Sequence, residues 1–342
     1  LPISRRLVLI DPGYEQPGEW KLALGATYLL PFNDIQLDVD YLYTKGKDPA
    51  LYEDLSQEVV GATITGAPIY DFTNGSDNLM LTNSDEKPVA HSISFALQKK
   101  FDWGLDMTFG YAYTDAEDVS PMTSSVAGSN FDNLATLDIN DPGVGTSNYV
   151  VPHRFTFKLS YARDFFGDLT SRFTLYGYGY EGQAQSYVMG SQDLEGDGFY
   201  GRHLLYVPTG LTDANVVFAD GFNSDEFFSF VQSEGLGTGY VSRNGTNADW
   251  SYRLDFRFDQ ELPTFSDDVY GKVFVKIFNL TNLLNKDWGN ANDARFFSVQ
   301  VLDSSVDDQG RYVFEEFSNR TVNDLYEQRS LWEARIGLEI SF

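Results

Sequence analysis

Hydrophobic and polar residues alternate one by one along segments of about ten residues, and such segments recur from one end of the chain to the other. In the first of them, Trp20, Leu22 and Leu24 share one phase, and Lys21 and Gly25 fall on the other. Because successive side chains of a β-strand point to opposite faces, each segment has one apolar and one polar face. The pattern predicts at least nine strands, at about residues 20–28, 35–43, 89–97, 105–113, 154–161, 171–180, 250–258, 269–278 and 332–342.

Short and long connections alternate strictly between these strands. The short ones fall at about residues 31–34, 101–104, 162–169 and 259–268, and the long ones at about 45–88, 115–152, 181–249 and 279–330. Outer-membrane β-barrels have this arrangement, with short periplasmic turns and long extracellular loops. Loops of this length are uncommon in compact soluble domains, so they favour a barrel over a soluble β-sandwich. The loops are rich in Asp, Asn, Gly and Ser, which predicts solvated surface.

Aromatic residues gather where the predicted strands meet turns, as in the aromatic girdles of membrane barrels. They are Trp20, Phe32, Phe101, Trp103, Phe165, Phe166, Trp250 and Trp332. The last predicted strand stops in mid-alternation, and in outer-membrane barrels a terminal aromatic strand is the usual insertion signal. We therefore predict an insertion signal made of Trp332, Ile336, Leu338, Ile340 and Phe342.

The composition excludes further classes of function. The 342 residues include 50 acidic and 24 basic side chains, for a formal charge of −26, and no cysteine. So acidic a chain is unsuited to nucleic acid, since binding phosphates requires a basic face. The charge suits a cell surface where divalent cations bridge carboxylates to anionic lipid, and it equally suits solubility alone. No stretch approaches the ~20 apolar residues of a membrane helix, and the mean hydropathy of −0.30 agrees.

The polar phase of the strands carries charges of both signs. If the apolar phase faces lipid, these side chains line the lumen, where they pair with one another across the wall or contact a plug or a solute. A charge at mid-depth on the lipid side would cost ~2–4 kcal/mol, which explains the segregation. The candidate lumen-facing residues are Asp38, Asp40, Asp106, Arg154, Lys158, Arg172, Arg253, Asp255, Arg257, Glu333, Arg335 and Glu339.

Six stretches resemble TonB-dependent receptors. The run Val273–Gly289, with its Asn-Leu-Thr-Asn segment, is similar to the penultimate strand of that family, and Leu331–Phe342 resembles the last strand. The other four are similar to the Oar-like branch: Asp115–Ala127, Pro152–Phe155, Phe165–Asp168 and Gly201–Pro208.

The resemblance implies an all-β, antiparallel transmembrane barrel of about 22 strands with long extracellular loops. It also implies an N-terminal plug and uptake energised through the TonB complex. The chain departs from this pattern, because it contains no plug, no TonB box and fewer than half of the strands. We therefore expect residues 1–342 to be the C-terminal segment of one barrel domain, as a fragment or as one chain of a split assembly. Its partners would be outer-membrane lipid, the remainder of the barrel and plug, and the TonB complex.

Sites for chemistry are sparse in the sequence. The histidines, His91, His153 and His203, have no metal-ligand spacing, so each is expected to be an ordinary strand or loop residue. Asp193, Glu195 and Asp197 resemble the start of a calcium loop, but Leu204 stands where the bidentate acid is expected. This is a weak calcium candidate, and a solvated acidic turn is the alternative. No nucleophile elbow with a supporting triad is present, so we predict no enzyme activity.

Three functions remain open from the sequence. The leading hypothesis is a bacterial outer-membrane receptor segment for TonB-dependent uptake of an unidentified solute, with Asn74–Lys87, Asp115–Val151 and Glu181–Asp249 as the capture surface. The second is a structural or adhesive outer-membrane barrel that displays its loops. The third is a secreted soluble β-sandwich that binds carbohydrate.

Overall fold

A computed structural model describes residues 7–31, 34–73, 78–190, 193–194, 196–198, 200–263, 269–293, 298–320 and 324–342. Long antiparallel strands dominate it, so the predicted all-β fold class is confirmed. None of the helices within these ranges is long and apolar enough to cross a membrane.

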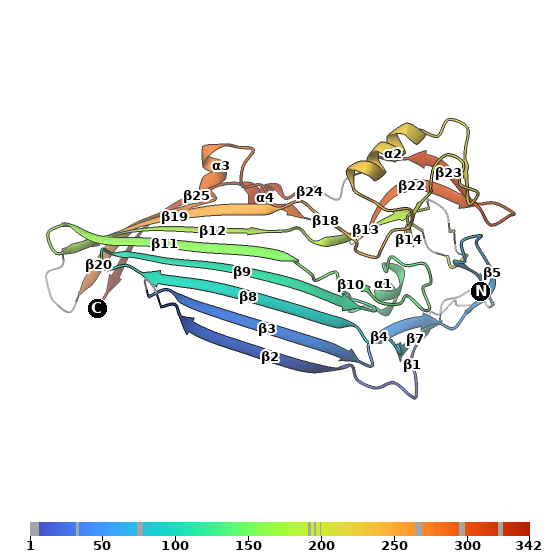
Figure 1. Cartoon of the computed structure of the whole chain (residues 1–342), viewed down its shortest axis with the longest axis horizontal. Coiled ribbons are helices and arrows are strands. Elements are labelled where there is room, and N and C mark those ends of the chain that lie inside the picture. The colour runs from blue at the N-terminus through green and yellow to red at the C-terminus, as the bar shows by residue number, and fades with distance from the viewer. Residues whose placement is uncertain are drawn as a thin grey trace, which may run out of the picture.

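Nine long strands form one continuous antiparallel meander, which we call the wall (Figure 1). Each strand pairs with its neighbour in chain order, and all nine predicted strands are present. Seven have 12 to 14 residues and the last two have 9. The wall strands are β2 (Gly18–Leu29), β3 (Gln36–Lys47), β8 (Val89–Lys100), β9 (Leu105–Asp118), β11 (His153–Phe166), β12 (Leu169–Tyr180), β19 (Ser251–Leu262), β20 (Tyr270–Phe278) and β25 (Glu333–Ser341).

Two predicted short connections are wrong in their bounds. Strand β11 continues to Phe166 and β12 begins at Leu169, so the predicted 162–169 link shrinks to two residues. Similarly, β19 continues to Leu262 instead of ending before residue 259. In both places the strand carries Arg, Asp or Glu past its apolar stretch, and these charges conceal the continuing alternation. Of the predicted turn at 31–34, Phe32 and Asn33 lie outside the described residues.

One face of the wall is apolar and open to its surroundings. Trp20, Leu24 and Ile336 are 73%, 59% and 79% exposed. Every buried hydrophobic residue of the described chain lies outside the nine wall strands. A β-sandwich would cover this face with a second sheet and bury it, so the soluble β-sandwich expected as a third alternative is not what forms.

The long connections fold together, which corrects the prediction that they are solvated loops. The described residues of 48–88, 119–152, 181–250 and 298–320 pack into a layer that we call the cap, at the opposite end of the wall from the short turns (Figure 1). Its helices are α1 (Ala127–Asp132) and α2 (Ser224–Ser233). Its strands are β4 (Ala50–Asp54), β5 (Gln57–Ala62), β6 (Pro68–Phe72), β7 (Asn78–Asn83), β10 (Gly145–Thr146), β13 (Ala184–Met189), β14 (His203–Leu204), β15 (Tyr206–Val207), β16 (Val216–Phe218), β17 (Gly239–Tyr240), β18 (Thr246–Asn247), β22 (Ser298–Val306) and β23 (Tyr312–Phe317).

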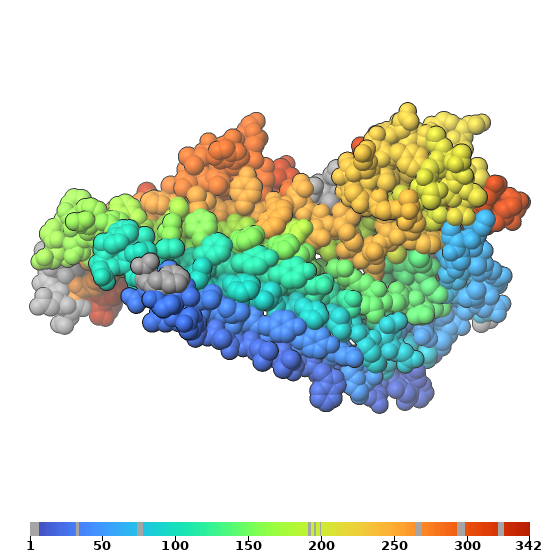
Figure 2. All heavy atoms as spheres, viewed as in Figure 1, coloured from blue at the N-terminus to red at the C-terminus, as the bar shows by residue number. Residues whose placement is uncertain are grey.

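The cap contains the hydrophobic cores of the described chain. The largest core packs α2 side chains such as Phe227 and Phe230 against Tyr312 and Phe314, which the last long connection contributes. In space-filling view the segment 181–250 stands out as a mass at the cap end (Figure 2). Strand β1 (Leu7–Ile10) joins the cap by pairing with β7. The remaining elements, α3 (Leu280–Leu284), β21 (Asn292–Asp293), β24 (Asp324–Leu325) and α4 (Glu327–Ser330), lie between β20 and β25.

Candidate functional site

The charged residues of the wall share one face. Directly paired residues point to the same side of a sheet, and the register matches Arg172 with Asp259, Tyr178 with Arg253, and Lys276 with Arg335. Following this register across all nine strands places the twelve predicted residues together. They are Asp38, Asp40, Asp106, Arg154, Lys158, Arg172, Arg253, Asp255, Arg257, Glu333, Arg335 and Glu339.

Many of these charges pair with one another along the wall. Arg253 Nε lies 2.6 Å from Asp255 Oδ1, and Arg335 Nε lies 2.5 Å from Glu333 Oε1. Arg257 pairs with Asp259, and its guanidinium lies 4.7 Å from the centroid of the Phe274 ring. This ring is on the polar face, because β20 is apolar on both phases apart from its two lysines.

A second polar group lies on the first strands of the wall. Asp38 accepts hydrogen bonds from Thr27 Oγ1 at 2.6 Å, from Gln36 Nε2 at 3.0 Å and from Gln98 Nε2 at 3.2 Å. The donors come from β2, β3 and β8, so this one carboxylate links three strands. Pairing within the wall therefore accounts for about half of the candidate residues.

A concavity of about 450 Å³ opens on the charged face. Its lining includes four cationic side chains, two carboxylates and four hydroxyl-bearing residues. The lining residues that matter below are Lys158, Ser160, Arg172, Arg257, Asp259 and Glu261. Thr170, Thr174, Tyr270 and Lys272 complete the lining. The sequence pattern identified Lys158, Arg172 and Arg257 as polar-face residues, but it did not show that they meet in one hollow.

The apolar face carries aromatic rings at both of its ends. Near the cap, Trp250 stacks on His153 and Phe155, and His153 Nδ1 lies 2.9 Å from Tyr111 Oη. His91 makes the equivalent 2.9 Å contact with Tyr41 Oη. Hydrogen-bonded imidazole and phenol groups suit an interface between apolar and aqueous layers. Sequence reasoning treated these histidines only as ordinary polar residues and missed their place in an aromatic band.

A second band lies beside the short turns. Trp103 packs against Phe101 and Tyr161 with ring centroids 5.5 and 5.8 Å apart, and Phe165 packs against Phe173 at 6.3 Å. The predicted aromatics Phe101, Trp103 and Phe165 therefore gather on one level of the sheet, whereas Phe32 lies outside the described residues. On β25, Ile336, Leu338 and Ile340 are exposed on the apolar face, and so are the flanking Trp332 and Phe342. Their role as an insertion signal stays a prediction.

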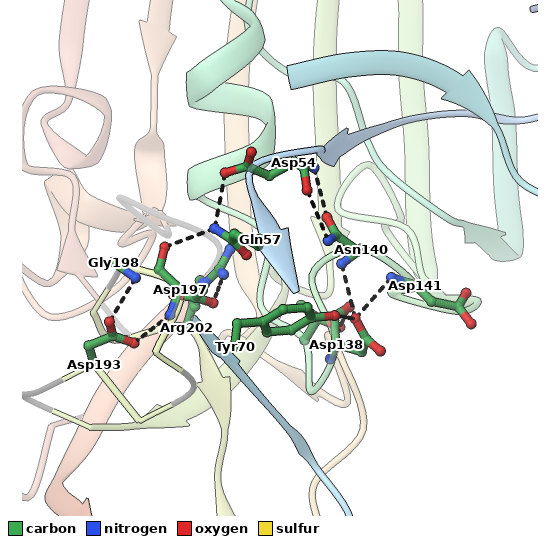
Figure 3. Close-up of polar contacts among 11 residues, drawn as sticks. Asp54, Gln57, Tyr70, Asp138, Asn140, Asp141, Asp193, Asp197, Gly198 and Arg202 are labelled. Carbon is green, nitrogen blue, oxygen red and sulfur yellow. Dashed lines mark hydrogen bonds and ion pairs between the residues drawn. The ribbon is translucent and has the colours of Figure 1, made fainter. Parts of the chain in front are cut away.

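Polar side chains fasten the cap connections to one another. Asp54 accepts Gln57 Nε2 at 3.0 Å, and Gln57 also donates to the carbonyl of Asp197 at 3.1 Å (Figure 3). Tyr70 donates to Asp138 at 2.5 Å, joining the first long connection to the second. These contacts tie residues 48–88 to the next two connections.

The described residues of the weak calcium candidate are engaged within their own turn. Asp193 accepts the backbone N–H groups of Asp197 at 3.0 Å and Gly198 at 2.7 Å, and Asp197 pairs with Arg202 (Figure 3). Glu195 lies outside the described residues. Across the described ranges, no group of three or more His, Cys, Asp or Glu side chains is placed to hold a metal ion. Asp193 and Asp197 thus serve the turn and its ion pair.

A second buried network surrounds His203. The Nε2 atom of His203 lies 2.8 Å from Tyr312 Oη, which in turn lies 2.6 Å from Tyr240 Oη. Thr63 and Thr65 of the first connection contact the same hydroxyl groups. Burial lowers the pKa of His203 to about 3, with a further contribution from the charge of Arg202. The imidazole is therefore neutral at ordinary pH and acts as a structural hydrogen-bonding group.

Comparison with known proteins shows a distant structural likeness. No family model matches the chain, and no curated protein matches it. The crystal structure of the outer membrane transporter YddB from Escherichia coli superposes with a TM-score of 0.48 at 12% sequence identity. The superposition covers 99% of this chain and 35% of the YddB chain, so this chain spans about a third of that transporter.

Proposed function

We propose that this chain forms part of the wall of a bacterial outer-membrane β-barrel transporter. One observation carries the proposal: the apolar face carries exposed large hydrophobic residues on seven of the nine wall strands, while the hydrophobic cores lie in the cap. Burying so much apolar surface against hydrocarbon removes it from water, which drives the wall into a bilayer. The charged face is then directed into an aqueous lumen, as in other barrels.

Strand dimensions agree with a membrane span. A tilted transmembrane β-strand needs about 9–11 residues, and the wall strands have 9 to 14. The aromatic bands beside the cap and beside the short turns lie where the two membrane interfaces would be. The cap would then be extracellular and the short turns periplasmic.

The wall is open at both sides. Strands β2 and β25 each pair with a single wall strand, and within the described residues nothing pairs with their outer edges. Unpaired backbone groups are not tolerated in hydrocarbon, so we propose that further strands complete the barrel. A plug and the TonB complex are the remaining proposed partners, and they rest on the family resemblance of the Val273–Gly289 and Leu331–Phe342 segments.

In this proposal the cap provides the surface that captures solute. Parts of Asn74–Lys87, Asp115–Val151 and Glu181–Asp249 contribute to it, with Asn74 outside the described residues. Polar networks hold these connections together, and a preorganised surface loses less entropy on binding than separate mobile loops. The function that we propose is TonB-dependent uptake of a solute.

Single cysteines test the lipid-facing assignment, because the natural chain has no cysteine. Ile93→Cys and Phe109→Cys are placed on the apolar face, with Ser94→Cys and Thr108→Cys as matched neighbours on the polar face. Each variant of the full protein is labelled with bimane in outer membranes or proteoliposomes. Lipids brominated along the acyl chains should quench the labels at positions 93 and 109 but not those at positions 94 and 108. Equal quenching on both faces would overturn the proposal, as would a protein that stays monodisperse without detergent.

A further inference from the structure

The concavity on the charged face has an unbalanced cationic lining. Lys158, Arg172, Arg257 and Lys272 line it, against Asp259 and Glu261. Arg257 is occupied by Asp259, and Lys272 Nζ lies 3.0 Å from Glu339. Glu261 accepts the backbone N–H of Thr170 at 2.9 Å and the hydroxyl of Tyr270 at 3.0 Å. Both lining carboxylates are therefore engaged elsewhere in the lining.

Two cations remain without a carboxylate. Within the described residues, Lys158 and Arg172 form no ion pair, and Arg172 donates only to the neutral Ser160 Oγ, at 3.3 Å. Asp106 lies opposite Ser160 on β9, but it does not line the concavity. Ser160 and Thr174 lie on the same two strands as Lys158 and Arg172, and their hydroxyl groups, 3.2 Å apart, add neutral donors.

We propose that this concavity is a binding site for a compact oxyanion, a carboxylate or phosphate group, held by Lys158 and Arg172. The planar guanidinium of Arg172 matches two oxygens of such a group, and the ammonium of Lys158 supplies a point charge from the adjacent strand. The low-dielectric wall strengthens their field on the lumen side. The site rests on the proposed function only in that the charged face must be wet.

The acidic cap does not oppose anion binding at this place. Arg172 lies eight positions along β12 from Tyr180, where the cap connection begins, and this corresponds to about 26 Å of strand. At physiological salt, charges farther apart than about 8 Å are largely screened. The electrostatic potential in the concavity therefore depends on its own lining residues rather than on the net charge of the molecule.

Titration calorimetry of the full protein in detergent, at about 0.15 M salt, tests the site with inorganic phosphate and with acetate as separate probes. We expect saturable binding of at least one probe, and at least tenfold weaker binding to the double variant Lys158→Gln/Arg172→Gln. Arg154→Gln removes a cation from the same face outside the lining, and it should bind like the natural protein. The exchange Lys158→Arg/Arg172→Lys keeps both charges and should retain binding within a few fold.

The outcomes distinguish failure of the anion site from failure of the proposed membrane wall. Absence of binding to the natural protein, or equal loss in Arg154→Gln and the double variant, would overturn the anion site. Failure of the proposed function would give a different result. The lipids would then quench the bimane labels on Ser94→Cys and Thr108→Cys. Binding by the exchange variant also shows that a loss in the double variant comes from charge rather than from misfolding.

Discussion

Asn279 shows how one residue of the Asn-Leu-Thr-Asn segment acts physically. It is fully buried and has a φ of 54°, in the left-handed region that Asn tolerates better than most residues. Its side-chain amide donates to the carbonyls of Gly289 at 2.9 Å and Ser330 at 2.8 Å. The residue therefore fixes both arms of the connection that leaves the wall after β20.

Replacing Asn279 with alanine should open this connection. Two buried carbonyl groups lose their donor, at about 1 kcal/mol each or more, and alanine adds roughly 1 kcal/mol of left-handed strain. We expect a loss of about 3 kcal/mol in local stability, measured as faster tryptic cleavage after Lys286 in the folded protein. Asn290→Ala, which removes one partly exposed bond to Asp287, is the control. Unchanged cleavage in Asn279→Ala would show that the buried amide does not hold the connection.

At the scale of elements, the sequence was most informative where strands are long and two-faced. The nine wall strands repeat their alternation over 9 to 14 residues, and all of them were predictable. The cap strands were not, because β13 (Ala184–Met189) is buried on both faces and has no polar phase. Several others have only two residues. Their pairing also joins distant segments in parallel, as β13 does with β22, and no local pattern contains that information.

The candidate site was predictable only in part for the same reason. Alternation assigns Lys158, Arg172 and Arg257 to a face, but their meeting point depends on the register between strands. Glu261 and Tyr270 lie at strand ends. The predicted link at 259–268 placed Glu261 outside the strand. The sequence therefore identified the chemistry of the face without locating the concavity.

Adjacent positions of β8 offer a direct test of the two faces at this scale. Ile93 pairs with Tyr113 on the apolar face, and Ser94 pairs with Ala112 and with Asp40 on the charged face. Ile93→Arg should cost ~2–4 kcal/mol, because a cation is placed in hydrocarbon. Ser94→Arg should cost little, since it gains Asp40 as a neighbour. Unfolding of the lipid-reconstituted protein in denaturant measures both, and equal losses would contradict the assignment of the faces.

Acidic and basic residues are distributed unevenly between the wall and the connections that join its strands. The connections between wall strands, residues 48–88, 119–152, 181–250 and 279–332, contain 30 acidic and 8 basic residues. The rest of the chain contains 20 and 16, so its charge is nearly balanced. Because the wall has nearly equal numbers of acidic and basic side chains, these can pair within a low-dielectric layer. An unpaired carboxylate has its lowest free energy in water. The acidity of the composition is therefore a property of the long connections, most of which form the cap.

The cap is expected to unfold as one unit, and Tyr312 is the residue that tests this. Its hydroxyl contacts His203 and Tyr240 from the third long connection and Thr63 and Thr65 from the first, while Tyr312 itself belongs to the fourth. Tyr312→Phe keeps the ring in the core but leaves buried partners unsatisfied, at about 1–3 kcal/mol.

If the network couples the connections, that loss is shared among all of them. Hydrogen exchange of the full protein should then accelerate roughly 5- to 150-fold in β5–β6, in β14–β15 and in β23 together, because each 1.4 kcal/mol is tenfold. Tyr270→Phe on the wall, which loses one exposed bond to Glu261, should alter exchange only near its own strand end. Acceleration confined to β23 in Tyr312→Phe would mean that the connections open independently, and a preorganised capture surface would then lack its physical basis.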